Sequence, residues 1–260
     1  MTPDFAPLQR VLDQWAAAGH LARFWLRDDD AVTPTSALDR LLEIGASHAV
    51  PLTLAVIPQP TGPALAGRLA QCERVEVAVH GWAHANHARP GRKSCELGDD
   101  RPSADVLVEL AAGLHRLGDL HGSRAVPLLV PPWNRIAPDV VSGLPGIGYA
   151  GLSVYGPEPA TAPLTVLNTH IDLIDWHGTR GGRPTGSMVS EITARLRQIA
   201  DTGPPAGPRT LGHVGILSHH LVHDRTAWNF LAGLLAATVG HPGCRWMSAA
   251  DLVLSSPPTG

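Results

Sequence analysis

The amino-acid sequence predicts an α/β fold, a distorted parallel (β/α) barrel of seven or eight strands that is TIM-like in plan. Short apolar runs alternate along the chain with longer stretches of helical periodicity. Helical crossovers between successive strands imply a mostly parallel sheet. Polar clusters directly follow four of the apolar runs, as they do at the carboxyl ends of barrel strands. Together these observations favour a barrel with one active-site mouth.

The predicted strands are short runs rich in apolar and β-branched residues, and their near-continuous apolar character indicates burial on both faces. They cover residues 24–27, 52–57, 75–79, 126–130 and 211–218. Between residues 143 and 186 the chain is rich in Gly and Pro, so no strand is assigned there. The segments 148–156 and 164–174 are the candidates.

The predicted helices lie between these runs and have apolar residues three and four positions apart. The clearest follows Ser103, the expected N-cap, and has leucines at positions 107, 110, 114 and 117. Segments 181–186 and 201–209 indicate exposed loops, and the last six residues a frayed tail. The six predicted helices cover residues 7–18, 35–48, 63–71, 103–120, 187–200 and 225–239.

The composition indicates one domain over residues 1–260. Hydrophobic residues make up 44% and charged residues 17% of the chain, which is enough to bury a core. A net charge of -3 argues against a nucleic-acid partner. The three cysteines form no Cys-x-x-Cys pair, which indicates a reducing compartment and argues against a thiolate zinc site. Because Asp4 and Asp13 interrupt the N-terminal segment, we expect neither a signal peptide nor a membrane span, and a cytoplasmic protein.

The polar clusters carry the candidate chemistry: aspartates 28–30, the pair His80 and His84, the segment 131–135, and the pair His219 and His220. Imidazoles four residues apart on one helical turn would point the same way and bind one divalent ion together with a carboxylate. Surface histidines and a solvated acidic turn are the alternatives. Three adjacent carboxylates are costly unless a cation or an arginine neutralises them. In extended backbone the first and third aspartates would share a face and the second would point away, unless the chain bends.

The same clusters contain candidate substrate-binding residues. Trp82, Trp133 and Trp176 lie within them, and indole faces at a barrel mouth suit a sugar ring, with core packing as the alternative. Asn134 and Arg135 are candidates to bind a substrate carboxylate or to orient an aspartate, since arginine favours bidentate contacts. For Arg135 the alternative is an ordinary loop charge.

In their order these motifs resemble those of the polysaccharide deacetylases, the carbohydrate esterase type with a chitooligosaccharide deacetylase homology domain. The segment LRDDDA at 26–31 is similar to the family's Thr-Phe-Asp-Asp-Gly, and HGWAH at 80–84 to its His-Ser/Thr-x-x-His. VPPW at 130–133 resembles Arg-Pro-Pro-Tyr, Asp175-Trp176 resembles an Asp-Trp element, and LSH at 217–219 resembles Leu-x-His. The resemblance spans residues 24–220.

The chain departs from the family pattern at three places. Gly81 stands where family members carry Ser or Thr, so a supporting hydrogen bond is expected to be lost. Val130 replaces the arginine that orients the catalytic aspartate, and Arg135 is the nearby candidate to take its role. The extra aspartate leaves the register open: base and ligand are the second and third aspartates, or the first and second.

The resemblance implies a metal-dependent hydrolase that acts on a small-molecule or oligosaccharide substrate. Zinc would be the ion, with Co²⁺ and Ni²⁺ as alternatives, and it would keep an open position for water. Asp29 is preferred as the base because the small Ala31 then stands where a turn follows; His219 would protonate the leaving amine, with His220 as the alternative acid. The implied metal ligands are one aspartate and two histidines, Asp30, His80 and His84.

Three functions remain as hypotheses at this point. The first is a deacetylase that removes an N-acetyl or O-acetyl group from a carbohydrate derivative. The second is a hydrolase of another small C–N substrate such as an amide, imide or ureide. The third is a non-catalytic binding protein on the same barrel, which the departures at Gly81 and Val130 would support.

Overall fold

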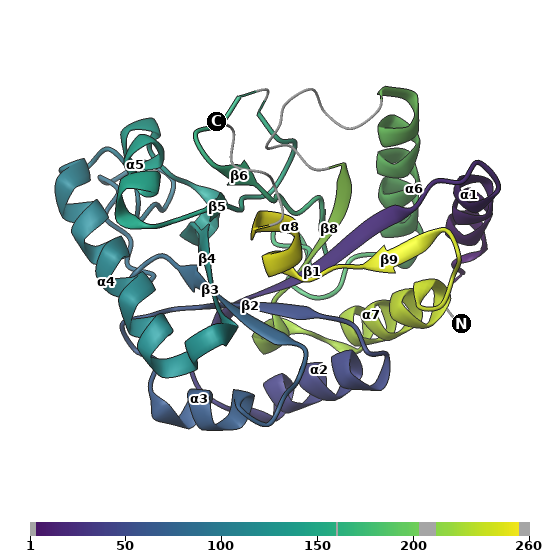
Figure 1. Cartoon of the computed structure of the whole chain (residues 1–260), viewed down its shortest axis with the longest axis horizontal. Coiled ribbons are helices and arrows are strands. Elements are labelled where there is room, and N and C mark those ends of the chain that lie inside the picture. Colours follow the sequence, from purple (N-terminus) through teal and green to yellow (C-terminus); the bar gives the residue numbers. More distant parts are fainter. Residues whose placement is uncertain (1–3, 160, 203–211, 255–260) are drawn as a thin grey trace.

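The computed structural model describes residues 4–159, 161–202 and 212–254, and its centre is a curled sheet of parallel strands (Figure 1). The hydrogen-bonded order is β6-β5-β4-β3-β2-β1-β8-β7, and β9 pairs with the start of β1. Eight strands in one parallel path confirm the distorted barrel. The strands are β1 (Ala22–Ala31), β2 (Leu52–Val56), β3 (Val75–His80), β4 (Ala125–Val130), β5 (Gly151–Leu152), β6 (Thr165–Val166), β7 (Ile171–Asp172), β8 (His213–Ser218) and β9 (Cys244–Trp246).

Helices lie against the outside of the sheet in the described part of the chain, with the exception of the last one (Figure 1). Six of them match the predicted helical segments within a few residues. Ser103 is the first residue of its helix rather than the N-cap: Pro102 holds the cap position, and no side chain caps this helix. The helices are α1 (Ala6–Ala17), α2 (Ser36–Ser47), α3 (Pro63–Leu69), α4 (Ser103–His121), α5 (Pro138–Gly143), α6 (Thr185–Thr202), α7 (Arg225–Thr238) and α8 (Ala249–Leu254).

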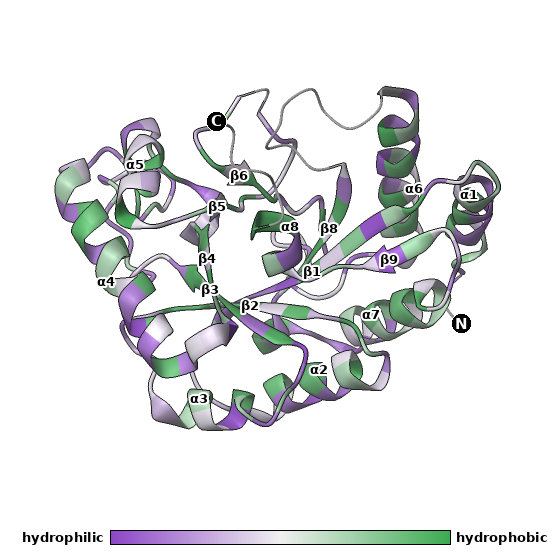
Figure 2. Ribbon diagram, viewed as in Figure 1, coloured by the Kyte–Doolittle hydropathy of each residue, from purple (hydrophilic) through white to green (hydrophobic). Residues whose placement is uncertain are grey.

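Two apolar cores hold the fold together. The larger lies between the outer face of the sheet and the helices, and Figure 2 shows hydrophobic residues along the strands and along the helices around them. The smaller fills the inside of the barrel around Trp25, Val126 and Leu128, and Leu252 and Val253 of α8 close it. The carboxylate of Glu76 accepts hydrogen bonds from the backbone of Ala249 and Ala250, at the start of α8. The end of the described chain therefore forms the floor of the barrel.

The sheet closes through one segment that contains both β6 and β7: β6 pairs with β5, β7 pairs with β8, and the bridge of Tyr155 with Thr169 extends the pairing of β5 with β6. Strands β5, β6 and β7 fall within the two segments named as candidates, whereas α5, β9 and α8 were not predicted. Most of the predicted loop 201–209 and the predicted tail 255–260 lie outside the described residues. None of the helices described is both long enough and apolar enough to span a bilayer.

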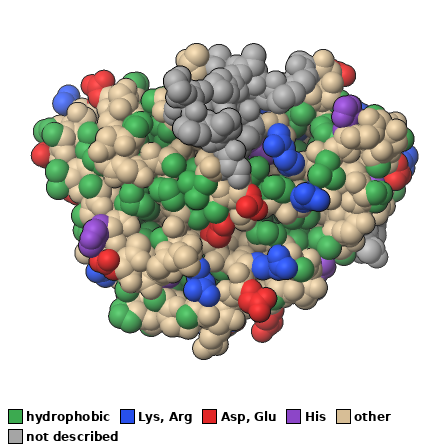
Figure 3. All heavy atoms as spheres, in the orientation of Figure 1, with side chains coloured by type: hydrophobic (Ala, Val, Ile, Leu, Met, Phe, Trp, Pro, Cys, Tyr) green, Lys and Arg blue, Asp and Glu red, His purple; other side chains and the backbone are tan. Residues whose placement is uncertain are grey.

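The outer surface carries charges of both signs. On the face seen in Figure 3, apolar side chains gather near the middle, and Lys, Arg, Asp and Glu are interspersed around them.

Candidate active site

A cavity of about 1040 Å³ opens where the carboxyl ends of the strands meet, and it collects most of the predicted site residues. Its lining includes two aspartates from the end of β1, two histidines from the end of β3 and beyond, and one histidine that follows β8. The lining includes Asp29, Asp30, His80, His84, Trp133, Asn134, Arg135, Asp172, Trp176 and His219.

The backbone at the end of β1 determines which of the three aspartates line the cavity. Strand residues alternate faces, so Arg27 and Asp29 share one face of β1 and Asp28 points away from them. The alternation then breaks, because Asp30 has a φ of 72° and the register with β2 shifts after Asp28. A left-handed backbone is unusual for a residue with a side chain. This bend brings Asp29 and Asp30 to the cavity together.

Asp28 has a different set of partners, all of them near the end of β8. It is fully buried, and it accepts hydrogen bonds from the Ser218 hydroxyl, the His220 backbone and His220 Nδ1. Burial disfavours both charges, but the mutual hydrogen bond outweighs it, so the pKa of Asp28 is lowered and the pKa of His220 is raised. Asp28 is thus occupied in fixing the turn that follows β8, and Asp29 and Asp30 are the pair at the cavity.

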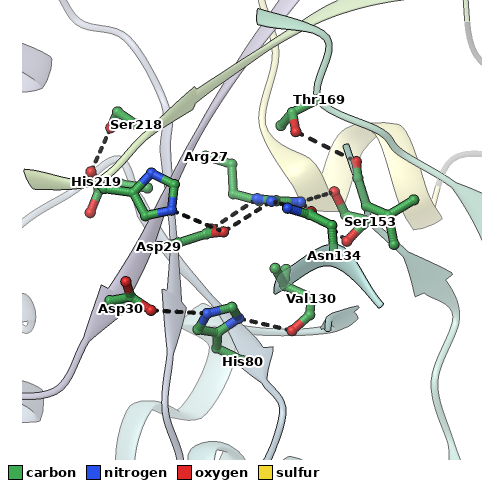
Figure 4. Close-up of polar contacts among 12 residues, drawn as sticks. Arg27, Asp29, Asp30, His80, Val130, Asn134, Ser153, Thr169, Ser218 and His219 are labelled. Carbon is green, nitrogen blue, oxygen red and sulfur yellow. Dashed lines mark hydrogen bonds and ion pairs between the residues drawn. The ribbon is translucent and has the colours of Figure 1, made fainter. Parts of the chain in front are cut away.

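Asp30, His80 and His84 form a compact group of ligand atoms, all within 4.8 Å of one another. Asp30 Oδ1 lies 3.1 Å from His80 Nε2 and 3.4 Å from His84 Nε2. His80 Nδ1 donates to the carbonyl of Val130 at 2.9 Å, so in the neutral ring Nε2 presents a lone pair to a carboxylate oxygen (Figure 4). Two acceptors at this distance require a proton or a cation between them. One carboxylate and two imidazoles, one of them oriented by a backbone carbonyl, suit a divalent ion.

The charge states of this group follow from its contacts. Burial opposes ionisation of Asp30, but the hydrogen bond with His80 and the neighbouring histidines outweigh it, so the pKa of Asp30 is lowered. The carboxylates of Asp30 and Asp29 raise the pKa of His80 despite its burial. Burial and the charge of His80 lower the pKa of His84.

The histidine pair does not lie on a helical turn, which corrects the expectation from its spacing. His80 ends β3, and His84 lies in the loop that follows, with a φ of 55°. The chain turns at Gly81, where φ is 60° and an added Cβ would lie 2.0 Å from Glu96 Oε2. The rings of His80 and His84 nevertheless meet, with centroids 5.2 Å apart.

Glu96 replaces the support expected to be lost at Gly81. Its side chain is buried, and its carboxylate accepts hydrogen bonds from the backbone of Trp82, Ala83 and Ala85, at 3.3, 2.7 and 3.4 Å. Three donors converge on one carboxylate because the positive φ at Gly81 folds the loop around it. Gly81 is therefore part of an alternative support for the histidine loop and not merely a missing side chain.

Arg27 holds Asp29, and this corrects the expectation for Arg135. Arg27 is fully buried; its Nη2 donates to Asp29 Oδ2 at 2.9 Å, and its Nε lies 2.9 Å from Asp29 Oδ1 (Figure 4). Nη1 donates to the carbonyl and hydroxyl of Ser153. Arg135 instead donates to the carbonyl of Ser94, at the rim of the cavity. The family's orienting arginine is absent at Val130, and a guanidinium from β1 lies on the aspartate instead.

His219 rather than His220 lines the cavity. Its Nε2 lies 4.0 Å from Asp29 Oδ2, and its ring meets the edge of Trp176 at 4.8 Å between centroids. Asp172 accepts a hydrogen bond from Trp176 Nε1 and so fixes that indole, and burial raises the pKa of Asp172. Adjacent residues after β8 face opposite ways, as expected, with His220 turned to Asp28.

The three tryptophans fall in different places. Trp133 and Trp176 line the cavity, and Trp133 packs against His84 with ring centroids 4.4 Å apart. Trp82, expected to bind substrate, is not among the lining residues. Its backbone is held by Glu96 and by the backbone of Gln59 in the turn that Gly81 begins.

Sequence reasoning missed Arg27, Asp28 as the partner of His220, and Glu96. For Arg27 a signal was present: an arginine at the end of an apolar strand run, directly before an acidic run, needs a buried carboxylate. For Glu96 no local pattern points to the loop fourteen residues earlier.

Comparisons with known proteins agree with this geometry at the level of the fold. No family model and no curated protein matches the sequence. Solved structures match over most of the chain. A Mycobacterium smegmatis protein described as a polysaccharide deacetylase has a TM-score of 0.66 at 14% identity, covering 92% of this chain and 91% of its own.

Two further structures come from named enzymes. The peptidoglycan deacetylase PdaC of Bacillus subtilis has a TM-score of 0.54 at 16% identity, with 89% and 90% of the two chains covered. The family 4 carbohydrate esterase of Streptomyces lividans, in complex with acetate, has 0.54 at 15%, with 86% and 90% covered. Such low identities establish the fold alone: this chain has the distorted barrel fold of the family 4 carbohydrate esterases and polysaccharide deacetylases.

Proposed function

We propose that this protein is a metal-dependent deacetylase that removes an N-acetyl or O-acetyl group from a carbohydrate derivative. The observation that carries the proposal is the junction at the end of β1. There Asp30 faces two imidazoles as a ligand group, while the neighbouring Asp29 is held by a buried arginine and faces His219. Hydrolysis by an ion-activated water requires one carboxylate that binds the ion and another that accepts a proton.

A divalent ion held by Asp30, His80 and His84 would lower the pKa of a water and polarise the substrate carbonyl. Zinc is the proposed ion, with Co²⁺ or Ni²⁺ as alternatives. Asp29 accepts the proton of the attacking water, since it lines the cavity beside Asp30 and its pairing with Arg27 keeps it ionised. His219 donates a proton to the leaving amine or alcohol, and Trp133 and Trp176 supply apolar walls.

The structure removes the main support for a non-catalytic binding protein. That hypothesis depended on the departures at Gly81 and Val130. Glu96 supports the histidine loop, and Arg27 holds Asp29, so each departure has a replacement nearby. A hydrolase of another small amide, imide or ureide would use the same groups, and the assay below separates it by its product.

The location and the partners of the enzyme are also part of the proposal. The three cysteines are free, which suits the reducing cytoplasm that we propose as its location. We propose no nucleic-acid or membrane partner.

The two aspartates should fail differently when each is changed to asparagine. D29N should keep its metal and lose kcat by about 10²–10⁴-fold, because a base is lost and a ligand is not. D30N should lose metal affinity by about 10-fold or more, since it removes a ligand charge. The measurements are metal content by mass spectrometry after dialysis, and acetate release from acetylated chitooligosaccharides and from acetylated xylan.

D28N provides the test of the register. It should reduce stability without removing the metal, because Asp28 bonds the turn after β8. Metal-retaining inactivity of D28N with full activity of D29N would shift the base to Asp28. Release of amine without acetate from a panel of small amides and imides would favour the second hydrolase, and a wild-type protein that binds no metal would refute the proposal.

A further inference from the structure

Asn134 occupies an unusual position in the cavity wall. It follows the prolines after β4, and both it and Trp133 have a φ of 55°, in the left-handed region. Asparagine tolerates this conformation better than most residues, but two such residues in succession, neither of them glycine, require firm support from their surroundings. Strained backbone of this kind gathers at functional sites.

The side-chain amide of Asn134 has a fixed orientation. Arg27 Nη2 donates to Asn134 Oδ1 at 3.1 Å, and a guanidinium only donates, so the oxygen must face it (Figure 4). The amide nitrogen Nδ2 is then left as a donor with two hydrogens. It has no hydrogen-bond partner in the part of the chain that the structure describes, and it is not among the atoms buried without a partner.

We propose that Asn134 binds the substrate, donating a hydrogen bond from Nδ2 to an uncharged oxygen acceptor, a carbonyl or hydroxyl, close to the bond that is cleaved. The inference rests on the proposed function and adds a binding residue to it. Arg27 contacts both Asp29 and Asn134, so one guanidinium holds the base and the donor at a fixed separation. The guanidinium charge behind the amide also polarises its N–H groups, which strengthens a hydrogen bond to an acceptor.

Asn134→Asp and Asn134→Gly separate substrate binding from support of Arg27. Aspartate keeps an oxygen for Arg27 and lacks the donor, whereas glycine lacks both and accepts a positive φ. If Nδ2 binds substrate, N134D should lower kcat/KM for acetate release from tri-N-acetylchitotriose by about 10-fold or more, at least as much as N134G. Metal content should stay at the wild-type level in both variants.

Asn229→Asp is the matched control. Asn229 is exposed on α7 and does not line the cavity. N229D adds the same charge and should leave kcat/KM unchanged. Retention of activity by N134D with loss in N134G would overturn the inference, because Asn134 would then act through Arg27. A loss of kcat/KM in N134D that vanishes at alkaline pH would also overturn the inference. The loss would then come from the added negative charge and not from the missing donor.

Failure of the proposed function has a different signature. If the wild-type protein releases no acetate, calorimetric titration with tri-N-acetylchitotriose decides the inference. Weaker binding by both N134D and N134G than by N229D would uphold the donor role without deacetylation. Equal binding by all variants, or none by the wild-type protein, would overturn it.

Discussion

Arg27 organises the site from a fully buried position. Its three nitrogens meet the Asp29 carboxylate, the Ser153 carbonyl and hydroxyl, and the Asn134 amide oxygen. A lone buried guanidinium would be very costly, and the paired carboxylate together with three neutral acceptors offsets much of that cost. The planar fork of arginine fits these partners, and the single ammonium of lysine does not.

Arg27→Lys should therefore impair catalysis while it keeps the charge. We expect kcat to fall by about 10- to 100-fold with metal content unchanged, since Asp29 and Asn134 lose a shared anchor. Steady-state kinetics and metal analysis of R27K measure both quantities. Arg135→Lys is the control: Arg135 contacts a backbone carbonyl at the rim, so we expect less than a threefold effect. The reverse ranking would return the orienting role to Arg135.

The loop between β3 and α4 is the element that completes the site. It carries His84, and it is held internally by Glu96 and externally by the contact of Arg135 with Ser94 and by a bridge between Leu97 and Ile136. Glu96 holds the loop only because Gly81 leaves room for its carboxylate.

Two glycines of this loop allow the effect of steric space on stability to be measured separately from the effect of backbone conformation. Gly81 and Gly91 both have positive φ, but an added Cβ at Gly91 meets nothing within 4 Å. Gly91→Ala should cost about 1 kcal/mol in the free energy of unfolding, from conformation alone. Gly81→Ala should cost at least about 2 kcal/mol more, because it displaces the buried Glu96 carboxylate from its three backbone donors, and it should weaken metal binding. Urea unfolding and metal titration of both variants test this, and equal costs would deny Glu96 its role.

Among the helices and strands, the sequence predicts those that are long enough to show a hydrophobic period. The runs around Phe24, Leu54 and Val77 form β1, β2 and β3. Of the four leucines after Ser103, two are buried in α4 and two are partly buried against the core. Strands β5, β6 and β7 have two residues each, too few for a period. The end of the chain, β9 and α8, is fixed by contacts with β1 and the barrel interior, and no local pattern contains those contacts.

The site was predictable only in part, because the sequence shows the spacing of residues and not the bends of the backbone. Spacing brought together Asp30, His80 and His84, but it suggested a helical turn where a positive φ at Gly81 and His84 bends a loop. The division of roles among the aspartates depends on the break at Asp30, which alternation alone cannot locate.

For the molecule as a whole, the junction of β6 and β7 is the place where the chain passes from pairing with β5 to pairing with β8, and a polar cluster lies beside it. Glu158, in the segment between β5 and β6, pairs with Arg195 of α6 and accepts a hydrogen bond from His170 Nε2 at 3.1 Å, and His213 of β8 lies beside it. His170 Nδ1 accepts the backbone N–H of Gly215, so both ring nitrogens of His170 are engaged. Although Glu158, His170 and His213 lie close enough to hold an ion, their hydrogen bonds and Arg195 indicate a structural cluster.

This cluster predicts how the stability of the barrel depends on pH. Burial opposes ionisation of Glu158, but the hydrogen bond from His170 and the surrounding positive groups outweigh it and lower its pKa from 4.5 to about 2. A folded-state pKa below the unfolded one means that the unfolded chain binds more protons between these values. The contribution, at most about 3 kcal/mol, is therefore fully present above pH ~5 and is lost as the pH falls towards 2.

Glu158→Gln removes the ionisable group and keeps its shape. The difference in unfolding free energy between the wild type and E158Q should be largest and constant above pH ~5, and should shrink as the pH falls from about 4.5 to about 2. Urea unfolding at a series of pH values measures it. Glu43→Gln, at an exposed position of α2, controls for loss of a surface charge and should change the free energy by less than about 0.5 kcal/mol. A difference for E158Q that stays constant down to pH 2 would show that this junction is held by packing and not by the charge of Glu158.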